Sequence, residues 1–180
     1  PLNYNWIPLP DEVKGKLLLL QYPGRASDGK IDPELMRADL AELKALGANR
    51  LVTLTPVAER IFIAGESLPQ ACEEMELLWQ EFPIQDYAVP TPEQQDLLAG
   101  LLDELIGALR LGKTIAIHCY GGIGRSGTLA GMILGKLGLS GQQAVDHVRA
   151  HRKGAIETLE QVDMVKKFGT APVLIASKAE

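Results

Sequence analysis

The chain has 180 residues, of which 46% are hydrophobic, and a formal net charge of −5 at neutral pH. This length and apolar content suit a single domain over residues 1–180, ending in a tail from 169 to 180. The acidic balance argues against a nucleic-acid partner, and apolar runs as short as residues 17–20 argue against a membrane partner.

The first half of the chain alternates strand and helix patterns. Residues 4–7 are expected to be extended, and the continuous apolar run at 17–22 predicts a buried strand. A helix is expected after Asp32, an N-cap followed by proline, and Gly47 is expected to end it. The next buried strand covers 51–55. This order favours parallel strands joined by a right-handed crossover.

The second half continues the alternation. Residues 61–63 fit either a brief strand or an apolar loop, and an extended segment is expected at 79–84. Asp86 lies in the proline-bearing loop that follows. Helices are expected at 69–78, 91–111, 125–137, 140–152 and 157–168. The predicted fold class is α/β, with a central, mostly parallel sheet of about four or five strands flanked by helices and a phosphate-binding loop between strand and helix.

A glycine-rich loop at 118–126 follows the apolar run 114–117 and precedes a helix. Such a turn points several backbone N–H groups into one concavity at the positive end of a helix dipole. Cys119 opens the loop and Arg125 closes it, where a nucleotide-binding loop would end in Lys-Ser/Thr. The intervening anion-binding residues are Tyr120, Gly121, Gly122, Ile123 and Gly124. A thiol above such a site suggests a nucleophile directed at phosphorus.

The loop also predicts partners for this chemistry. Its amides, the dipole and Arg125 favour the reactive thiolate of Cys119, and the Ser126 hydroxyl is placed to donate to the sulfur. Asp86 is the expected acid and base, because its loop follows a strand end and should lie at the same sheet edge. His118 alternates with Cys119, so its ring is expected to point away and support the loop backbone.

These residues resemble the signature of cysteine-dependent protein tyrosine phosphatases, His-Cys-x5-Arg-Ser/Thr, at 118–126. The small size is similar to the dual-specificity branch, and the loop is similar to that of the cyclin-dependent-kinase-associated phosphatase group. The likeness extends to 5–10, 83–86, 154–158 and Gln161. Bacterial members typically carry proline where this chain has Lys153.

The resemblance implies a phosphoric monoester hydrolase of the protein-tyrosine-phosphatase type. The three histidines are spread over the chain and form no metal-binding cluster with acidic residues, so we expect no metal and no cofactor. The resemblance also implies that Asp86 is the general acid and that Gln161 helps to position the hydrolytic water. The implied substrate is a protein carrying phosphotyrosine, with phosphoserine and phosphothreonine left open. We expect the protein to be a monomer. We also expect it to lie in the cytoplasm, because a functional thiol needs a reducing compartment and two cysteines do not make a disulfide framework.

Other readings stay open at this point. The substrate could be a phosphoinositide or another non-protein phosphate, and weaker alternatives are a rhodanese-type sulfurtransferase and a non-catalytic phosphoprotein-binding module. Cys72 reads as a buried apolar residue. The basic cluster of Arg149, His151, Arg152 and Lys153 fits either a solvated helix end or a surface that attracts phosphosubstrates. The glycines at 127, 131 and 135 predict close packing against a neighbouring helix.

Overall fold

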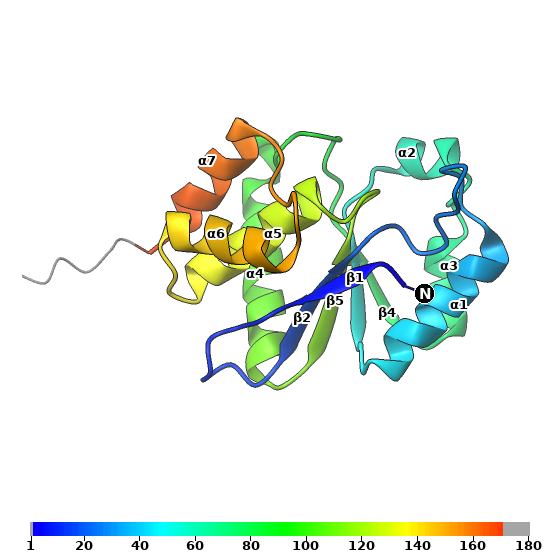
Figure 1. Cartoon of the computed structure of the whole chain (residues 1–180), viewed down its shortest axis with the longest axis horizontal. Coiled ribbons are helices and arrows are strands. Elements are labelled where there is room, and N and C mark those ends of the chain that lie inside the picture. Colours follow the sequence, from blue (N-terminus) through cyan, green and yellow to red (C-terminus); the bar gives the residue numbers. More distant parts are fainter. Residues whose placement is uncertain (1, 171–180) are drawn as a thin grey trace, which may run out of the picture.

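The central sheet of the computed structural model, which describes residues 2–170, has five strands in the order β1-β2-β5-β3-β4 (Figure 1). Strand β1 pairs with β2 in antiparallel fashion, and the other pairs are parallel. The predicted mostly parallel sheet is therefore confirmed. The strands are β1 (Tyr4–Ile7), β2 (Lys16–Leu20), β3 (Arg50–Thr53), β4 (Leu78–Glu81) and β5 (Thr114–His118).

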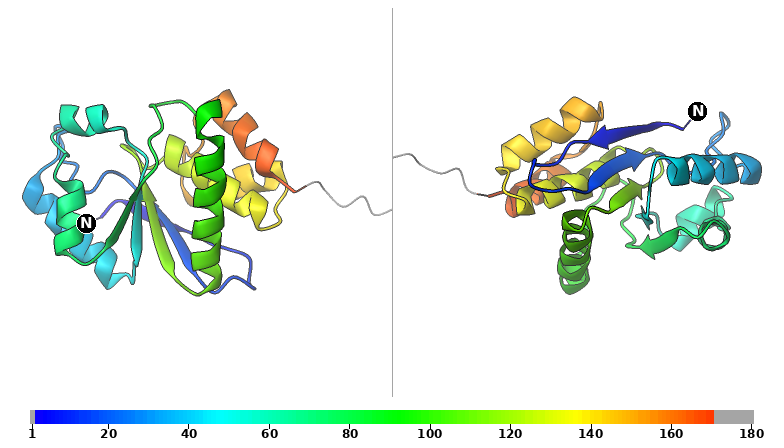
Figure 2. Two further views of the ribbon diagram at one scale, coloured as in Figure 1. Left: turned by 180° about the vertical axis from the view of Figure 1, so that it is seen from behind. Right: turned by 90° about the horizontal axis from the view of Figure 1, so that it is seen from below.

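Helices cover both faces of this sheet (Figures 1 and 2). One face packs against α1 (Pro33–Ala45) and α3 (Leu68–Glu74). The other packs against α4 (Gln95–Arg110), α5 (Gly124–Lys136), α6 (Gly141–His151) and α7 (Leu159–Phe168). A short 3₁₀ turn, η1 (Pro92–Gln94), precedes α4. Between residues 2 and 170, no helix has the length and apolar character needed to cross a membrane.

The two helical layers explain the continuous apolar run of β2. Leu17 and Leu19 point into the cluster shared with α4 and α5, whereas Leu18 and Leu20 point into the cluster shared with α1. Successive strand residues face opposite sides of a sheet, so a strand covered on both faces needs apolar residues at every position. The run therefore predicts a central strand correctly.

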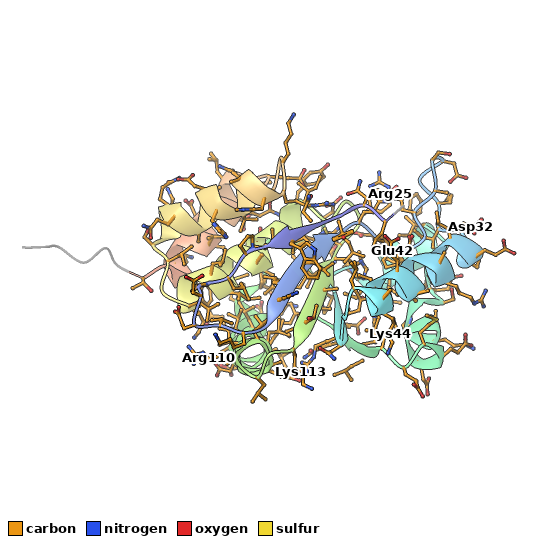
Figure 3. All side chains as sticks on the ribbon, turned by 60° about the horizontal axis from the view of Figure 1, so that its bottom comes forward. Arg25, Asp32, Glu42, Lys44, Arg110 and Lys113 are labelled. Carbon is orange, nitrogen blue, oxygen red and sulfur yellow. The ribbon has the colours of Figure 1, made fainter. Side chains whose placement is uncertain are left out.

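The helix starts follow their capping residues. Asp32 Oδ1 accepts a hydrogen bond of 2.9 Å from Leu35 N at the start of α1. Asp32 and Lys44 lie toward opposite ends of this helix, as Figure 3 shows. Thr158 and Gln161 form a capping box at the start of α7, so this helix begins at Leu159 and not at residue 157. The polar sequence signals therefore locate these ends to within about two residues.

The expectation of a strand or a loop at 61–63 is wrong. Ile61 and Phe62 end a short helix, α2 (Val57–Phe62), and Ile63 is its C-cap residue. Tertiary contacts hold this helix: Arg60 is buried, donates to the carbonyl of Thr55 and forms an ion pair of 2.6 Å with Glu81. Phe62 is 77% exposed, whereas Ile63 is buried in the cluster shared with α1 and α3, so only the end of the apolar run belongs to the core.

The glycine face of α5 packs against the chain from Ala155 to Phe168, as predicted. A Cβ at Gly131 would lie 2.8 Å from the Val165 methyl groups, and one at Gly135 would lie 2.7 Å from the Phe168 carbonyl oxygen. The absence of side chains at these positions lets α5 and α7 approach closely. This contact places the N-terminus of α7 beside the glycine-rich loop.

Candidate active site

The glycine-rich loop joins β5 to α5 at the carboxyl end of the parallel strands, between α2 and α7 in Figure 1. Cys119 is 3% exposed, and the N–H of Gly122 donates to its Sγ at 3.3 Å. Gly122 has a φ of +70°, and a Cβ there would collide with the Leu20 carbonyl oxygen. This position therefore requires glycine. Because α5 begins at Gly124, the thiol lies at the positive end of the helix dipole.

Arg125 is buried, and its guanidinium connects three segments. It donates to both carboxylate oxygens of Glu59 at 3.0 Å and to the Ile84 carbonyl oxygen at 3.0 Å. Its Nη2 also lies 3.3 Å from Asp86 Oδ1. Burial lowers the pKa of Arg125, but the hydrogen bonds to Glu59 and the charges of Cys119, Glu59 and Asp86 together more than offset it, so the pKa is raised. The arginine is therefore permanently charged.

Asp86 lies on a loop that faces the glycine-rich loop across the site. Its side chain is 53% exposed, so its carboxylate is open to solvent as well as to Arg125. Asp86 Oδ1 accepts a hydrogen bond of 3.0 Å from the N–H of Tyr87, which has a φ of +62°. A carboxyl group with this access can exchange protons with a bound molecule.

Gln161 is completely buried beside this loop. Its Nε2 donates to the Ala88 carbonyl oxygen at 3.1 Å, and its Oε1 accepts from the N–H groups of Glu157 and Thr158 at 2.9 and 3.2 Å. The amide thus joins the start of α7 to the loop that carries Asp86. The exposed carboxylate of Glu157 lies against Gly124, where any Cβ would collide with it.

The imidazole of His118 is buried behind the loop. Its Nδ1 lies 2.8 Å from the Cys119 carbonyl oxygen, which can only accept, so Nδ1 carries the proton. The Thr53 hydroxyl then donates to Nε2 at 2.6 Å and itself accepts from Trp79 Nε1 at 2.7 Å. Burial lowers the pKa of His118 to about 3, so the ring is neutral at physiological pH.

Ser126 lies in the first turn of α5 and is fully buried. Its Oγ has no hydrogen-bond partner among the described residues. An unpaired buried hydroxyl costs free energy unless a partner arrives during function. Thr55 Oγ1, after β3, is in the same situation.

A cleft of about 380 Å³ opens beside Asp86 and Glu59. The Tyr120 hydroxyl donates to the Gly29 carbonyl oxygen at 2.9 Å and fixes one wall. Arg25, labelled in Figure 3, holds its guanidinium 4.1 Å from the centre of the Tyr120 ring. The residues that line the cleft are Asp28, Gly29, Lys30, Glu59, Phe62, Ile63, Asp86 and Tyr120.

Two charged residues of this site, Glu59 and Arg152, are not predicted as site residues from the sequence. Glu59 follows β3, whose carboxyl end borders β5, and that position is a signal that indicates the site edge. Arg152 is 5% exposed and bonds to the backbone of the glycine-rich loop. Both readings of the basic cluster are therefore wrong for Arg152, which is neither solvated nor part of a surface open to substrate.

Fold and site together define a cysteine-based phosphatase, and comparison with known proteins agrees. Residues 30–168 match the family described as "Swiss Army Knife protein, DSP-PTPase phosphatase domain". The chain belongs to this family and is a phosphoric monoester hydrolase of the dual-specificity protein tyrosine phosphatase type.

Individual relatives match most of the chain. The chain is 28% identical over 177 residues to "Cyclin-dependent kinase inhibitor 3" of Rattus norvegicus, covering 93% of this chain and 79% of the relative. Its structure is similar to that of a kinase associated phosphatase with its catalytic-site cysteine changed to serine, with a TM-score of 0.83, 26% identity, and coverage of 93% and 94%. The structure is also similar to that of Tk-PTP in the active form, with a TM-score of 0.66 and 29% sequence identity. This match covers 88% of this chain and 96% of Tk-PTP.

Proposed function

We propose that this phosphatase hydrolyses phosphorylated proteins in two steps, with Cys119 transiently phosphorylated between them. The supporting observation is that Asp86 and the glycine-rich loop meet at Arg125, with 3.3 Å between Nη2 and Oδ1. A nucleophile, a fixed cation and a carboxyl group at one site are what this chemistry requires.

In the first step, the Cys119 thiolate attacks phosphorus. The loop amides from Tyr120 to Gly124 and the planar guanidinium of Arg125 hold the phosphate oxygens. The sulfur–phosphorus bond forms as the bond from phosphorus to the leaving oxygen breaks. Protonated Asp86 gives its proton to that oxygen, so the leaving group departs as a neutral alcohol or phenol.

In the second step, water attacks the cysteinyl phosphate. The Asp86 carboxylate accepts a proton from this water, and the sulfur–phosphorus bond breaks to return the thiolate. The unpaired Ser126 hydroxyl is suited to donate to the departing sulfur. We assign two roles to Gln161. It holds the Asp86 loop through its hydrogen bond to Ala88. As the family resemblance implies, it also positions the attacking water.

The cleft and the relatives support the proposed substrate class. A space of about 380 Å³ with Tyr120 and Phe62 among its lining residues suits an aromatic side chain, which favours phosphotyrosine. Phosphoserine and phosphothreonine belong to the same proposal. One similar structure is named a kinase associated phosphatase, which supports a phosphorylated protein as the substrate.

The two cysteines support the proposal of a reducing compartment. Both are free thiols, and Cys119 must stay reduced to act as a nucleophile. Cys72 lies in α3 on the other side of the sheet, where burial raises its pKa to about 12, so it is not suited to protect Cys119 by forming a disulfide. We therefore place the enzyme in a reducing compartment such as the cytoplasm.

The experiment is hydrolysis of an aryl phosphate in EDTA by the wild-type chain and by Cys119→Ser. The wild type should release phosphate and the variant should not; full activity of the variant would exclude the cysteinyl-phosphate reaction. A panel of phosphopeptides, phosphoinositides and nucleotides, with Cys119→Ser used as a substrate trap, then tests the substrate class. Thiocyanate formation from thiosulfate and cyanide would indicate a sulfurtransferase, and tight phosphopeptide binding without turnover a binding module.

A further inference from the structure

Every carbonyl group of the loop from Cys119 to Gly124 is held from outside. His118 binds the carbonyl of Cys119, the N–H of Tyr22 binds that of Tyr120, and the N–H of Ile156 binds that of Ile123. Thr128 Oγ1 donates to the Gly124 carbonyl at 2.7 Å. Because the two ends of a peptide unit point in opposite directions, fixing the carbonyl groups outward turns the N–H groups toward the phosphate site.

Arg152 holds the middle of this loop. Its Nε donates to the Gly122 carbonyl oxygen at 2.8 Å, and its Nη2 donates to that of Gly121 at 3.2 Å. Its Nη1 donates to Asn5 Oδ1 at 2.9 Å, which ties the guanidinium to the edge strand β1. Among the donors to the loop carbonyls within residues 2–170, Arg152 is the one that carries a full charge, since His118 is neutral.

The charge of Arg152 is unusual for its position. Burial lowers the pKa of its guanidinium, and the negative charge of Cys119 acts in the opposite direction. No carboxylate within residues 2–170 forms an ion pair with it. Burying a cation without a carboxylate is costly, so its placement behind an anion-binding loop is best explained by the anion.

We propose that Arg152 is a positioning residue that fixes the Gly121 and Gly122 peptide units toward the phosphate and supplies a second positive charge beside Cys119. This inference rests on the proposed function, in which the loop binds phosphate and Cys119 reacts as a thiolate. Arg125 and Arg152 then divide the task. Arg125 contacts Asp86 directly, whereas Arg152 acts through the carbonyl groups of the loop backbone.

The test compares Arg152→Gln with Arg149→Gln. Arg149 is a matched control because it is one turn earlier in α6 and also donates to two carbonyl groups, those of Ala155 and Ile156, at 3.0 and 2.7 Å. The readouts are the rate of Cys119 alkylation by iodoacetamide at pH 6, inhibition by inorganic phosphate, and the unfolding midpoint in urea. Mass spectrometry assigns the alkylation to Cys119, since Cys72 is fully buried.

Arg152→Gln should slow alkylation about tenfold and raise the phosphate inhibition constant about tenfold, which corresponds to about 1.4 kcal/mol in each case. Arg149→Gln should change neither, although both variants lose stability. Equal alkylation rates and equal inhibition constants in the two variants would overturn the proposal, because Arg152 would then contribute to folding alone.

Arg152→Lys provides a second test that keeps the buried charge if Arg152→Gln does not fold. Lysine lacks the fork that reaches two carbonyl groups, so phosphate binding should weaken several-fold while alkylation stays within about twofold of the wild type. Wild-type phosphate binding in this variant would contradict the positioning role. Alkylation needs no turnover, so a chain without phosphatase activity would refute the proposed function and still report on Arg152.

Discussion

The guanidinium of Arg125 donates to both carboxylate oxygens of Glu59, at 3.0 Å each, although the two residues belong to α5 and α2. The bidentate pair sets the orientation of the arginine before any phosphate is bound. Because Glu59 also lines the cleft, this pair connects the glycine-rich loop to one wall of the cleft. The short helix α2 is thus part of the site.

Glu59→Ala should weaken phosphate binding by about tenfold and leave a mobile Arg125, because a charged hydrogen bond contributes about 1.5–3 kcal/mol. Steady-state kinetics with an aryl phosphate checks this as an increase in KM. Glu59→Gln, which retains one acceptor, should lie between the wild type and Glu59→Ala. Glu73→Gln on the exposed surface of α3 is the control. An unchanged KM in Glu59→Ala would show that Arg125 is oriented by other contacts.

Asp86→Asn should lower kcat by roughly 10²–10⁴ because amide nitrogen does not exchange protons as a carboxyl group does. The loss should be largest for substrates with poor leaving groups such as alkyl phosphates. The pH profile of kcat, measured with leaving groups of different basicity, checks this. If the variant keeps the wild-type profile, the acid is another residue.

Gln161→Ala should lower kcat in the same way as Asp86→Asn but to a smaller extent, because the amide that holds Ala88 beside the site is lost. Its effect should therefore depend on the leaving group, and we expect a loss of about tenfold. Pre-steady-state kinetics separates the role of Gln161 in holding the Asp86 loop from a role in positioning the attacking water. Slow hydrolysis of the cysteinyl phosphate, equal for all substrates, would indicate that Gln161 acts on water.

His118 should make stability depend on pH. Its pKa is lowered from 6.5 to about 3 in the folded protein, so the unfolded chain binds more protons between these values. The stabilisation is present in full above about pH 6.5 and is lost as the pH falls toward 3. Urea unfolding at several pH values should show this slope, and His118→Asn should flatten it. An equal slope in that variant would assign the pH dependence to other groups.

Gly131→Ala should destabilise the fold by about 1–3 kcal/mol, because the new methyl group would meet Val165 at 2.8 Å. Gly100→Ala is the matched control in α4, where a Cβ meets nothing within 4 Å. That change should stabilise by about 0.5–1 kcal/mol through helix propensity. Thermal unfolding measures both. Equal effects of the two changes would contradict the close packing of α5 on α7.

The sequence predicts well the features that are local. The segment 118–126 contains its strand end, glycines, cysteine and arginine within one stretch, so spacing alone indicates the loop. Buried strands such as β2 and helix starts such as Asp32 carry equally local signals. Asp86 could be proposed because strand ends of an α/β sheet share one edge, and its ion contact with Arg125 agrees with that placement.

The contacts that the sequence does not predict are long-range. Glu59 and Arg152 look like surface charges on short polar stretches, and only the packing of α2 and α6 brings them to the loop. The segment 57–62 is helical because Arg60 is anchored to Glu81 and Thr55, which no periodicity within so short a segment reveals. Partners distant in sequence require the assembled fold.

The most direct test of the central claim is to trap the intermediate. The wild-type chain is mixed with a phosphotyrosine peptide labelled with ³²P and quenched in acid within milliseconds. We predict label bound to the peptide fragment that contains Cys119, at up to one equivalent, and none in Cys119→Ser. Turnover of the same substrate by Cys119→Ser, or label on any other residue, would contradict the account.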